Sequence, residues 1–374
     1  MREFIDGAEA IVRGALAAGC NFFAGYPITP ATPILLQMLR QLPKRGGIGI
    51  QGEDEIASIG MCIGAAMTGM KAMTATSGPG ISLYSENIGM ALMGEVPLVI
   101  VDVMRLGPAT GGATTVSQGD VQFLRWCTSG GLPVIALCPS NLAECFTLTM
   151  HAFNLAEKFR TPVFIATDKE TVATQQSVDT DTFQRIEIIN RTYASADAEF
   201  IPYHIKKLAD VPAFAPIGGM HLTRFTTSMH DERGMLTKKP SNVNKTSRHL
   251  YQKIEAHRAE LEWTRLDAEP GATTLVVSYG ISTRSMIQAV RNTRARGERV
   301  SMLTVQSLFP VPEQSLRNAM RGVSRVIVPE LNFGQYRLEI ERIAATLDPR
   351  PQVIGVNRVD GELITPEEIQ EPMI

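Results

Sequence analysis

Short β-rich runs alternate with helical segments through the first 170 residues, and this alternation constrains the fold more than any other feature of the chain. The runs read NFFAGY, GIGIQ, AMTAT, VPLVIVDV, LPVIALC and TPVFIAT. Such alternation predicts a parallel sheet with helices on both faces. VPLVIVDV is almost wholly apolar, which is typical of a central strand buried on both sides.

The pattern changes at about residue 168 and returns near residue 270. Between these points charge rises and prolines and histidines are scattered, so we expect a long crossover without a core of its own. A length of 374 residues suits two domains. We predict a first domain over 1–190, an interdomain crossover over 191–268 with a polar helix at roughly 243–263, and a smaller α/β domain over 269–374.

Charge and composition exclude several classes of protein. A net charge of −2 gives no electrostatic basis for binding nucleic acid. The longest apolar run, Val96–Val103, is far shorter than the ~20 residues that a membrane span needs. The first 19 residues are expected to form an amphipathic helix rather than a signal peptide. None of the five cysteines forms a C-x-x-C pair that could ligate zinc or an iron–sulfur cluster. We therefore expect a cytoplasmic protein that binds no nucleic acid and no membrane.

Ligands of open parallel sheets bind at the carboxyl ends of the strands, in the loops that lead to the next helix. The first such loop is Tyr26-Pro27-Ile28-Thr29-Pro30. Its two prolines fix the backbone on either side of Thr29. Thr29 could present its hydroxyl to a ligand, or it could simply cap the next helix with Pro30 at the first helical position. The residues alone leave both interpretations open.

The second loop opens a helix with Glu53, Asp54 and Glu55. Acidic residues at a helix start are favoured by the helix dipole and mostly do no more than that. The helix that follows has an apolar stripe and two glycines that would let another surface approach: Ile56, Ile59, Ile63 and Met67, with Gly60 and Gly64. A glutamate at the edge of such a helix would be desolvated and could act as a proton donor.

Two more loops, at 74–80 (TATSGPG) and 104–120 (MRLGPATGGATTVSQGD), are rich in glycine and hydroxyl residues. Arg105 follows the most apolar strand, where its guanidinium could bind a carboxylate in a bidentate manner or lie solvated at the surface. No phosphate-binding P-loop or dinucleotide-binding glycine motif is present, and no Gly-Asp-Gly precedes an asparagine at a suitable spacing.

Taken together, YPITP, EDEIA, TATSGPG and the Arg105 loop resemble the α subunit of 2-oxoacid:ferredoxin (acceptor) oxidoreductases. SYGISTRSMIQAV and PELNFGQ resemble that family's second domain, and TTSMHDERG its interdomain segment. The resemblance covers nearly the whole chain. It implies a doubly wound parallel sheet of the thiamine-diphosphate-binding type and a smaller domain like the transketolase C-terminal domain.

The resemblance also implies roles for particular residues. Glu55 would bond N1′ of the cofactor's aminopyrimidine, Thr29 would lie near the thiazolium and the substrate, and Arg105 would bind the substrate carboxylate. These three are the expected catalytic residues. Further cofactor contacts are expected from the same loops, at Tyr26, Pro27, Thr76 and Ser77. No metal ligand is expected in this chain.

The implied reaction is the oxidative decarboxylation of a 2-oxoacid, with 2-oxoglutarate favoured, to acyl-CoA and CO₂. A β subunit would hold Mg²⁺, the diphosphate half of the site and a [4Fe-4S] cluster, in an αβ dimer of dimers that reduces ferredoxin or another acceptor. One departure is the loop Gly112-Ala113-Thr114-Thr115, where 2-oxoglutarate-type relatives read closer to G-x-P-T. Two alternatives are a component of a non-oxidative thiamine-diphosphate decarboxylase and a non-catalytic scaffold.

Overall fold

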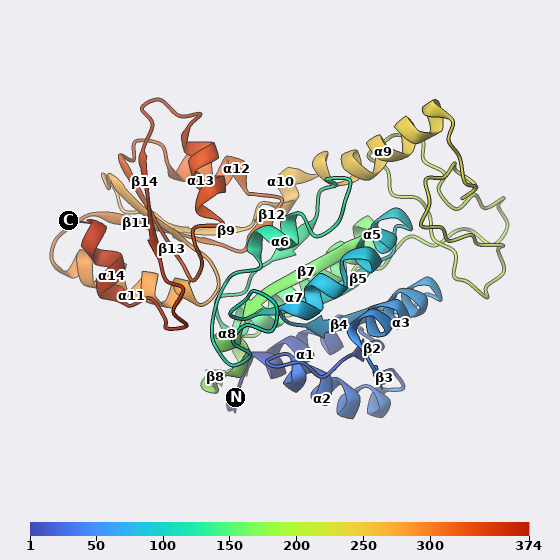
Figure 1. The fold of residues 1–374 in the computed structure, drawn as a ribbon, viewed down its shortest axis with the longest axis horizontal. Coiled ribbons are helices and arrows are strands. Elements are labelled where there is room, and N and C mark those ends of the chain that lie inside the picture. The colour runs from blue at the N-terminus through green and yellow to red at the C-terminus, as the bar shows by residue number, and fades with distance from the viewer. Residues whose placement is uncertain (374) are drawn as a thin grey trace.

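The computed structural model describes residues 1–373 and contains two α/β units around two main sheets (Figure 1). The larger sheet has seven strands, and those from β6 to β3 are parallel. Their order is β12 (Ser307–Phe309), β6 (Ile135–Leu137), β7 (Pro162–Asp168), β5 (Leu98–Met104), β4 (Ala72–Thr76), β2 (Phe22–Gly25) and β3 (Ile48–Gln51). Each strand predicted in the first 170 residues is present in this sheet.

Helices cover both faces of the larger sheet, as the alternation predicts. One face packs on α1 (Gly7–Ala17), α2 (Thr32–Gln41) and α7 (Leu142–Phe159). The other packs on α3 (Glu55–Met67), α4 (Pro79–Leu83), α5 (Ser85–Met93) and α6 (Val121–Arg125). All seven residues of β5 are buried, which confirms the central strand.

The smaller sheet has five strands, and β9 alone is antiparallel to its neighbour. Their order is β14 (Gln352–Asn357), β13 (Arg325–Glu330), β10 (Thr274–Ser278), β11 (Val300–Val305) and β9 (Thr264–Asp267). The helices of this unit are α11 (Ser282–Ala295), α12 (Glu313–Ala319), α13 (Arg337–Ala344) and α14 (Pro366–Gln370). A capping box of Thr365 and Glu368 opens α14.

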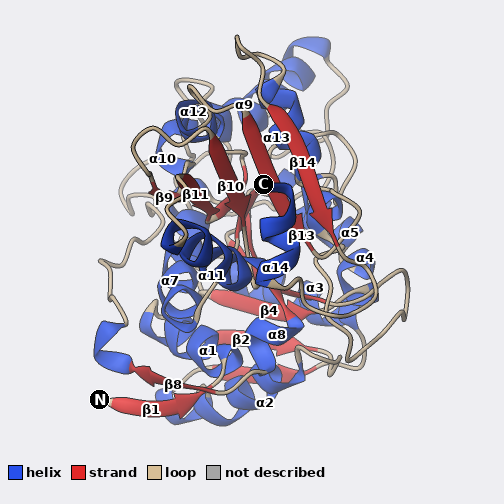
Figure 2. Cartoon of the chain, turned by 90° about the vertical axis from the view of Figure 1, so that its left-hand side faces the viewer, coloured by secondary structure: helices blue, strands red, loops and turns tan. Residues whose placement is uncertain are grey.

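The two units share one hydrophobic core. Strand β12 follows β11 of the smaller sheet and pairs antiparallel with β6 of the larger one. Residues of both units, including Ile100 and Val277, belong to the same buried cluster. Figure 2 shows the smaller sheet and its helices stacked on the larger unit. This packing brings loops of the second unit to the edge of the first sheet.

The first residues do not form the start of a helix, which corrects the expectation for the N-terminus. β1 (Arg2–Ile5) pairs antiparallel with β8 (Gln176–Asp179), which follows the short α8 (Lys169–Ala173). The Asp6 side chain then accepts from the Glu9 N–H and starts α1 at the next residue. Three short 3₁₀ helices are also present, at Pro43–Arg45, Thr180–Thr182 and Glu371–Met373.

The polar helix of the crossover begins earlier than expected and is interrupted. α9 (Pro240–Glu255) starts with a proline at its first position, and α10 (Arg258–Leu261) follows after a break. Between residues 183 and 239 the chain has no helix or extended ladder, and Figure 1 shows these loops reaching away from both sheets. A buried ion pair of Arg191 with Glu157 holds the start of this segment against α7.

No helix within residues 1–373 combines the length and the apolar character needed to cross a bilayer. All five cysteines are buried free thiols.

Candidate active site

Glu55 is the first residue of α3 and lies at the carboxyl edge of the larger sheet. Asp54 is the N-cap, because its side chain accepts from the Ala57 N–H. That division leaves the Glu55 carboxyl free of the capping role, and the residue is only 8% exposed. Glu53 and Asp54, by contrast, are exposed. Of the three acids, Glu55 alone is directed into the protein.

Gly80 shapes the space beside this carboxyl. A Cβ at position 80 would lie 2.0 Å from Oγ1 of Thr76 and 3.1 Å from Oε1 of Glu55. Position 80 therefore admits no side chain without displacing Thr76, and the glycine lets the Thr76 hydroxyl and the Glu55 carboxyl approach the same backbone. Thr76 Oγ1 and Ser77 Oγ are buried and have no hydrogen-bond partner among the described residues. A buried acid close to unpaired buried hydroxyls can hydrogen-bond a polar ring.

The YPITP loop does not cap the next helix, so that interpretation of Thr29 is wrong. α2 begins at Thr32 with Ala31 as its N-cap, which makes no side-chain capping bond. Thr29 and Pro27 are exposed, and Tyr26 is half-buried. The loop is connected to the rest of the site through its backbone, because the Thr29 carbonyl accepts from Nη1 of Arg105.

Arg105 is not a solvated surface arginine, since it is only 4% exposed. Its Nη2 donates to the Thr110 carbonyl at 3.1 Å, in addition to the bond to Thr29. Its Nε is buried and has no partner among the described residues. Gly78, with a φ of +49°, packs against the same side chain, where a Cβ would lie 3.1 Å from Nε. Arg105 thus joins three of the four loops that the sequence singled out, those at 26–30, 74–80 and 104–120.

The loops at 74–80 and 104–120 and the PELNFGQ motif line a cavity of about 630 Å³ between the two units. Its walls include Pro79, Leu106 and Phe123 from the first unit and Asn332 and Phe333 from the second. Beside this cavity, Gln118 connects the two units by hydrogen bonds. Its Oε1 accepts from Ser282 Oγ at 3.0 Å, and its backbone carbonyl accepts from the Asn332 side chain at 2.8 Å. The glycine-rich loops of the first unit and the PELNFGQ motif of the second therefore lie side by side at this cavity.

Two acidic residues of this region were missed in the sequence analysis. Asp102 on β5 is fully buried, and Asp120 lines the interdomain cavity. The signal for Asp102 was an aspartate inside an otherwise apolar central strand. Gln118 had no comparable signal, because its role depends on packing between units far apart in sequence.

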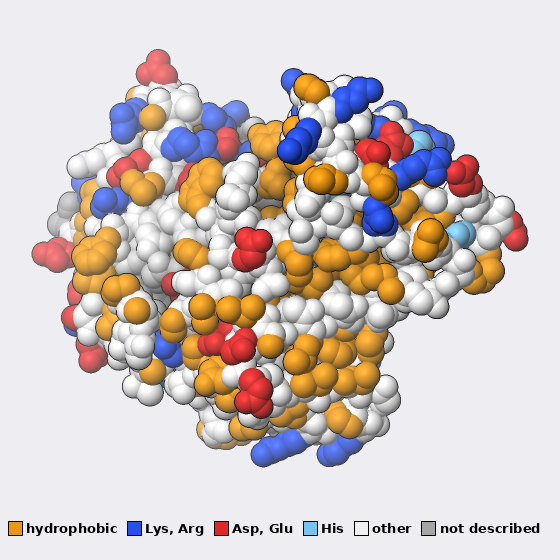
Figure 3. Space-filling view, turned by 45° about the vertical axis from the view of Figure 1, so that its right-hand side comes forward, with side chains coloured by type: hydrophobic (Ala, Val, Ile, Leu, Met, Phe, Trp, Pro, Cys, Tyr) orange, Lys and Arg blue, Asp and Glu red, His pale blue; other side chains and the backbone are white. Residues whose placement is uncertain are grey.

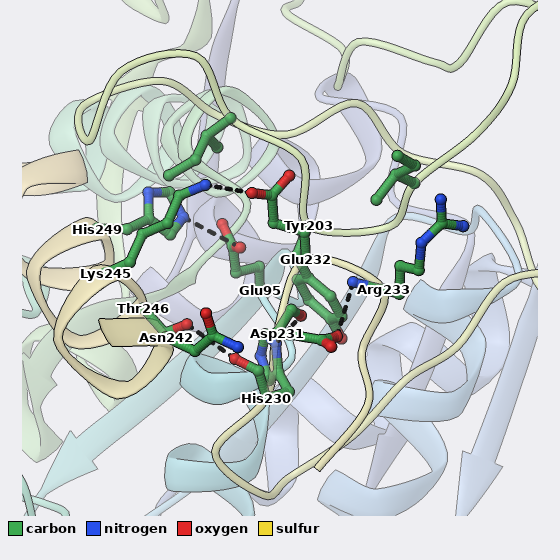
Figure 4. Close-up of a pocket in the computed structure, with 12 residues that line it drawn as sticks. Glu95, Tyr203, His230, Asp231, Glu232, Arg233, Asn242, Lys245, Thr246 and His249 are labelled. Carbon is green, nitrogen blue, oxygen red and sulfur yellow. Dashed lines mark hydrogen bonds and ion pairs between the residues drawn. The ribbon is translucent and has the colours of Figure 1, made fainter. Parts of the chain in front are cut away.

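A second cavity, of about 360 Å³, lies at the opposite edge of the larger sheet (Figure 4). It is next to Glu95, which precedes β5, and to residues of the crossover and α9. Two ion pairs lie in its wall: Lys245 with Glu232, and His249 with Glu95 at 3.1 Å. This cavity lies at the interface between the crossover and the first unit. None of the predicted site residues lines it.

The doubly wound sheet, with a buried acid and glycine-rich loops at its carboxyl edge, defines a thiamine-diphosphate-binding domain. The family model described as "Pyruvate flavodoxin/ferredoxin oxidoreductase, thiamine diP-bdg" matches residues 13–254. "Pyruvate:ferredoxin oxidoreductase core domain II" matches residues 272–369. The chain belongs to this oxidoreductase family.

Relatives and solved structures agree with this assignment. The chain is 42% identical over 376 residues to "2-oxoglutarate synthase subunit KorA" of Methanocaldococcus jannaschii, covering 100% of this chain and 99% of that protein. A 2-oxoglutarate:ferredoxin oxidoreductase from Magnetococcus marinus superposes with a TM-score of 0.90 at 30% identity, and the chain covers 64% of it. A split-gene transketolase (TM-score 0.55, 12% identity, 98% and 96% of the two chains) shares the fold. The predicted fold class is confirmed.

The residues at the carboxyl edge fit thiamine diphosphate. The observation that tests this is the pair of buried hydroxyls, Thr76 Oγ1 and Ser77 Oγ, that have no hydrogen-bond partner among the described residues, close to the buried Glu55 carboxyl. A carboxyl in that place can bond a ring nitrogen of the cofactor's aminopyrimidine.

Proposed function

We propose that the chain is the α subunit of a 2-oxoacid:ferredoxin oxidoreductase that converts 2-oxoglutarate and coenzyme A into an acyl-CoA and CO₂. The observation that carries this proposal is the buried Glu55 carboxyl facing Gly80 and Thr76 at the carboxyl edge of the sheet. The choice of 2-oxoglutarate is supported by the KorA relative, which matches along its whole length.

The partner in this proposal is a β subunit that holds Mg²⁺, the diphosphate half of the cofactor site and a [4Fe-4S] cluster. The surface next to Glu55 supports it. Ile56, expected inside the apolar stripe of α3, is 52% exposed, whereas Ile59 and Ile63 are buried. Ile56, Met61 and Leu83 leave apolar surface on this side of the molecule, where Figure 3 shows hydrophobic side chains gathered. Assembly as an αβ dimer of dimers, in the cytoplasm and with ferredoxin as acceptor, completes the proposal.

The contribution of this chain to the reaction is binding, orientation and proton transfer. Thiamine diphosphate, when bound, supplies the electron sink for decarboxylation. Glu55 would bond N1′ of the aminopyrimidine from its buried position and would donate or accept the proton there. Arg105 binds the oxoacid carboxylate, and Thr29, Tyr26 and Pro27 form the wall that the Arg105 guanidinium holds in place. Thr76 and Ser77 offer hydroxyls to the cofactor.

The experiment that tests this function is co-expression with the β-type partner, followed by an assay of acceptor reduction with 2-oxoglutarate and coenzyme A. Pyruvate and a branched-chain 2-oxoacid serve as comparison substrates. CO₂ release without acceptor reduction would instead support the non-oxidative decarboxylase. A complex that binds no thiamine diphosphate at millimolar concentration would support the scaffold. The family assignment favours neither of these alternatives.

Replacing Arg105 by lysine is expected to raise KM for the oxoacid about 10- to 100-fold, since a charged hydrogen bond contributes roughly 1.5–3 kcal/mol. Lysine cannot reproduce the planar fork that reaches Thr29, Thr110 and a carboxylate together. Steady-state kinetics of the co-expressed pair measure the change. Arg45→Lys, at an exposed position, is the matched control. An unchanged KM in Arg105→Lys would remove the carboxylate-binding role.

A further inference from the structure

Gln118 belongs by sequence to the first unit, but its hydrogen bonds lead to the second. The side chain is fully buried. Its Oε1 accepts from Ser282 Oγ at 3.0 Å and from the Leu331 N–H at 3.1 Å, and its Nε2 donates to the Tyr279 carbonyl at 3.2 Å. Its backbone N–H donates to the Leu331 carbonyl at 2.9 Å, and its own carbonyl accepts from Asn332 Nδ2. Each polar group of Gln118 therefore has a partner in the second unit.

The residues on either side of Gln118 are attached in the same way. Ser117 Oγ donates to a backbone carbonyl of the second unit at 3.0 Å. The Gly119 carbonyl accepts from Nε2 of Gln335, in the PELNFGQ motif, at 2.6 Å. Val116 is buried in a hydrophobic cluster whose other members all belong to the second unit. The end of this loop is therefore built into the second unit.

The partners in the second unit are themselves held in place. Oδ1 of Asn332 accepts from the N–H groups of Gly334 at 2.7 Å and Gln335 at 2.8 Å. Its Nδ2 donates to the Tyr279 hydroxyl at 3.0 Å, which in turn donates to the buried Glu330 carboxylate at 2.8 Å. A hydrogen-bond network in which each member has its partners fixes the position of its groups. The PELNFGQ motif thus offers a rigid attachment to the loop.

The start of the same loop carries Arg105. The Leu106 N–H donates to the Thr115 carbonyl at 3.0 Å, and the Leu106 carbonyl accepts from the Gly112 N–H at 2.8 Å, so the loop closes on itself. Within this closed part, the Thr110 carbonyl accepts from Nη2 of Arg105 at 3.1 Å. A shift of the attached end of the loop would therefore move one of the two carbonyls that hold the guanidinium.

The second unit also contacts the closed part of the loop directly. A Cβ at Gly361 would lie 2.1 Å from Cγ2 of Thr115, so the glycine permits a close approach of the two segments. Pro108 lines the cavity between the units together with Phe333 and Val359 of the second unit. The loop that carries Arg105 is thus held against the second unit both along its length and at its end.

Building on the proposed function, we propose that Gln118 is a positioning residue for substrate binding. By attaching the Arg105 loop to the PELNFGQ motif, it sets the place of the Arg105 guanidinium and hence the affinity for the oxoacid carboxylate. The second unit thereby takes part in recognition of the oxoacid. When the attachment is lost, Arg105 keeps its other hydrogen bond, to the Thr29 carbonyl. The effect is therefore smaller than that of replacing Arg105 itself.

The decisive variant is Gln118→Met in the co-expressed complex. Methionine has a similar length but forms none of the side-chain hydrogen bonds of the glutamine, so KM for the oxoacid is expected to rise about 3- to 10-fold. The affinity for thiamine diphosphate should stay at the wild-type value, because Glu55 belongs to α3 and not to this loop. Steady-state kinetics and cofactor titration measure the two quantities. An unchanged KM, or an equal loss of cofactor affinity, would overturn the proposal.

A double-mutant cycle with Arg105→Lys tests whether Gln118 acts through Arg105. Effects of residues that depend on one another are not additive, whereas effects of independent residues are. In the Arg105→Lys background, Gln118→Met should therefore change KM for the oxoacid by less than about 2-fold. If the two effects on KM instead multiply, Gln118 acts independently of Arg105 and the proposal is wrong.

Asp168→Asn is the matched control. Oδ2 of the fully buried Asp168 accepts from the Ile281 N–H at 3.0 Å, so this residue also bonds across the two units, but from β7 rather than from the Arg105 loop. The variant should lower Tm and leave KM for the oxoacid unchanged. A rise in KM equal to that of Gln118→Met would make Gln118 an ordinary contact between the units and contradict its positioning role.

Ser282→Ala is a milder variant for the case in which Gln118→Met does not fold. It removes one donor to Oε1 of Gln118 and leaves the Leu331 N–H as the other. KM for the oxoacid should rise by less than in Gln118→Met, again without a loss of cofactor affinity. A folded Ser282→Ala complex with the wild-type KM would count against the proposal.

Hydrogen–deuterium exchange provides a readout that does not depend on turnover. The amides of Leu106, Gly112 and Thr115 close the loop, so they should exchange faster in Gln118→Met than in the wild type, while the amides of β5 keep their protection. Asp168→Asn should leave the exchange of these loop amides unchanged. If the wild-type complex turns over no 2-oxoacid, the proposed function fails. If the loop amides of Gln118→Met exchange at the wild-type rate, the attachment by Gln118 is refuted.

Discussion

Replacing Glu55 by glutamine is expected to lower kcat of the assembled complex by about 10²- to 10⁴-fold, the range typical of a lost general acid–base group. Glutamine keeps the size of the side chain and its place beside Gly80, but it cannot hold or return a proton. The fold should be unaffected, because Asp54 rather than Glu55 caps α3. Turnover with saturating 2-oxoglutarate and coenzyme A measures the effect, and circular dichroism checks the fold.

Glu53→Gln is the matched control for this variant. Glu53 precedes the same helix but is exposed, so its replacement should leave kcat close to the wild-type value. The reverse result would be normal turnover in Glu55→Gln and lost turnover in Glu53→Gln. It would assign the proton transfer to Glu53 and refute the proposed role of Glu55.

The second large effect concerns stability. Glu95 is fully buried at the amino end of β5 and pairs with Lys253 at 2.7 Å and with His249 at 3.1 Å. Glu95→Gln leaves the Lys253 ammonium buried without its counter-charge, so the free energy of unfolding should fall by about 3–5 kcal/mol. Urea denaturation of the complex measures this loss.

The same ion pairs predict acid sensitivity. Despite the opposing effect of burial, the charges of Lys253 and His249 hold the pKa of Glu95 well below its usual range. A depressed carboxyl pKa contributes stability above the unfolded value, and that stability is lost as the pH falls towards the folded value. Glu298→Gln, which breaks an exposed pair with Arg296, should cost less than about 1 kcal/mol. An equal loss of unfolding free energy in Glu95→Gln and Glu298→Gln would contradict the stabilising role of the buried Glu95 ion pairs.

The larger sheet was predictable because its signals are local. Runs such as AMTAT and VPLVIVDV carry the β pattern within a few residues, and each forms a strand of the larger sheet. The N-terminal strand was missed, because Arg2–Ile5 is held by pairing with Gln176–Asp179, a contact far along the chain. β12 could not be predicted for the same reason, since its partner β6 belongs to the other α/β unit.

The sequence allowed the loops of the candidate site to be predicted, but not how their side chains are buried or which groups they contact. Sequence alone left open whether Thr29 capped a helix and whether Arg105 was solvated. The structure decides both against the simpler interpretation, because the Arg105 guanidinium reaches across to the Thr29 carbonyl. Asp102 and Asp120 are 18 positions apart in the chain, and only the fold shows that both carry buried carboxylate oxygens without a hydrogen-bond partner among the described residues.

The central claim is that this chain supplies the pyrimidine half of a thiamine diphosphate site through Glu55. A structure of the co-expressed complex with the cofactor and Mg²⁺ tests it most directly. We predict that the Glu55 carboxyl lies within hydrogen-bond distance of N1′, with the diphosphate held by the other subunit. An aminopyrimidine bound away from Glu55, or a diphosphate held by this chain, would contradict the claim.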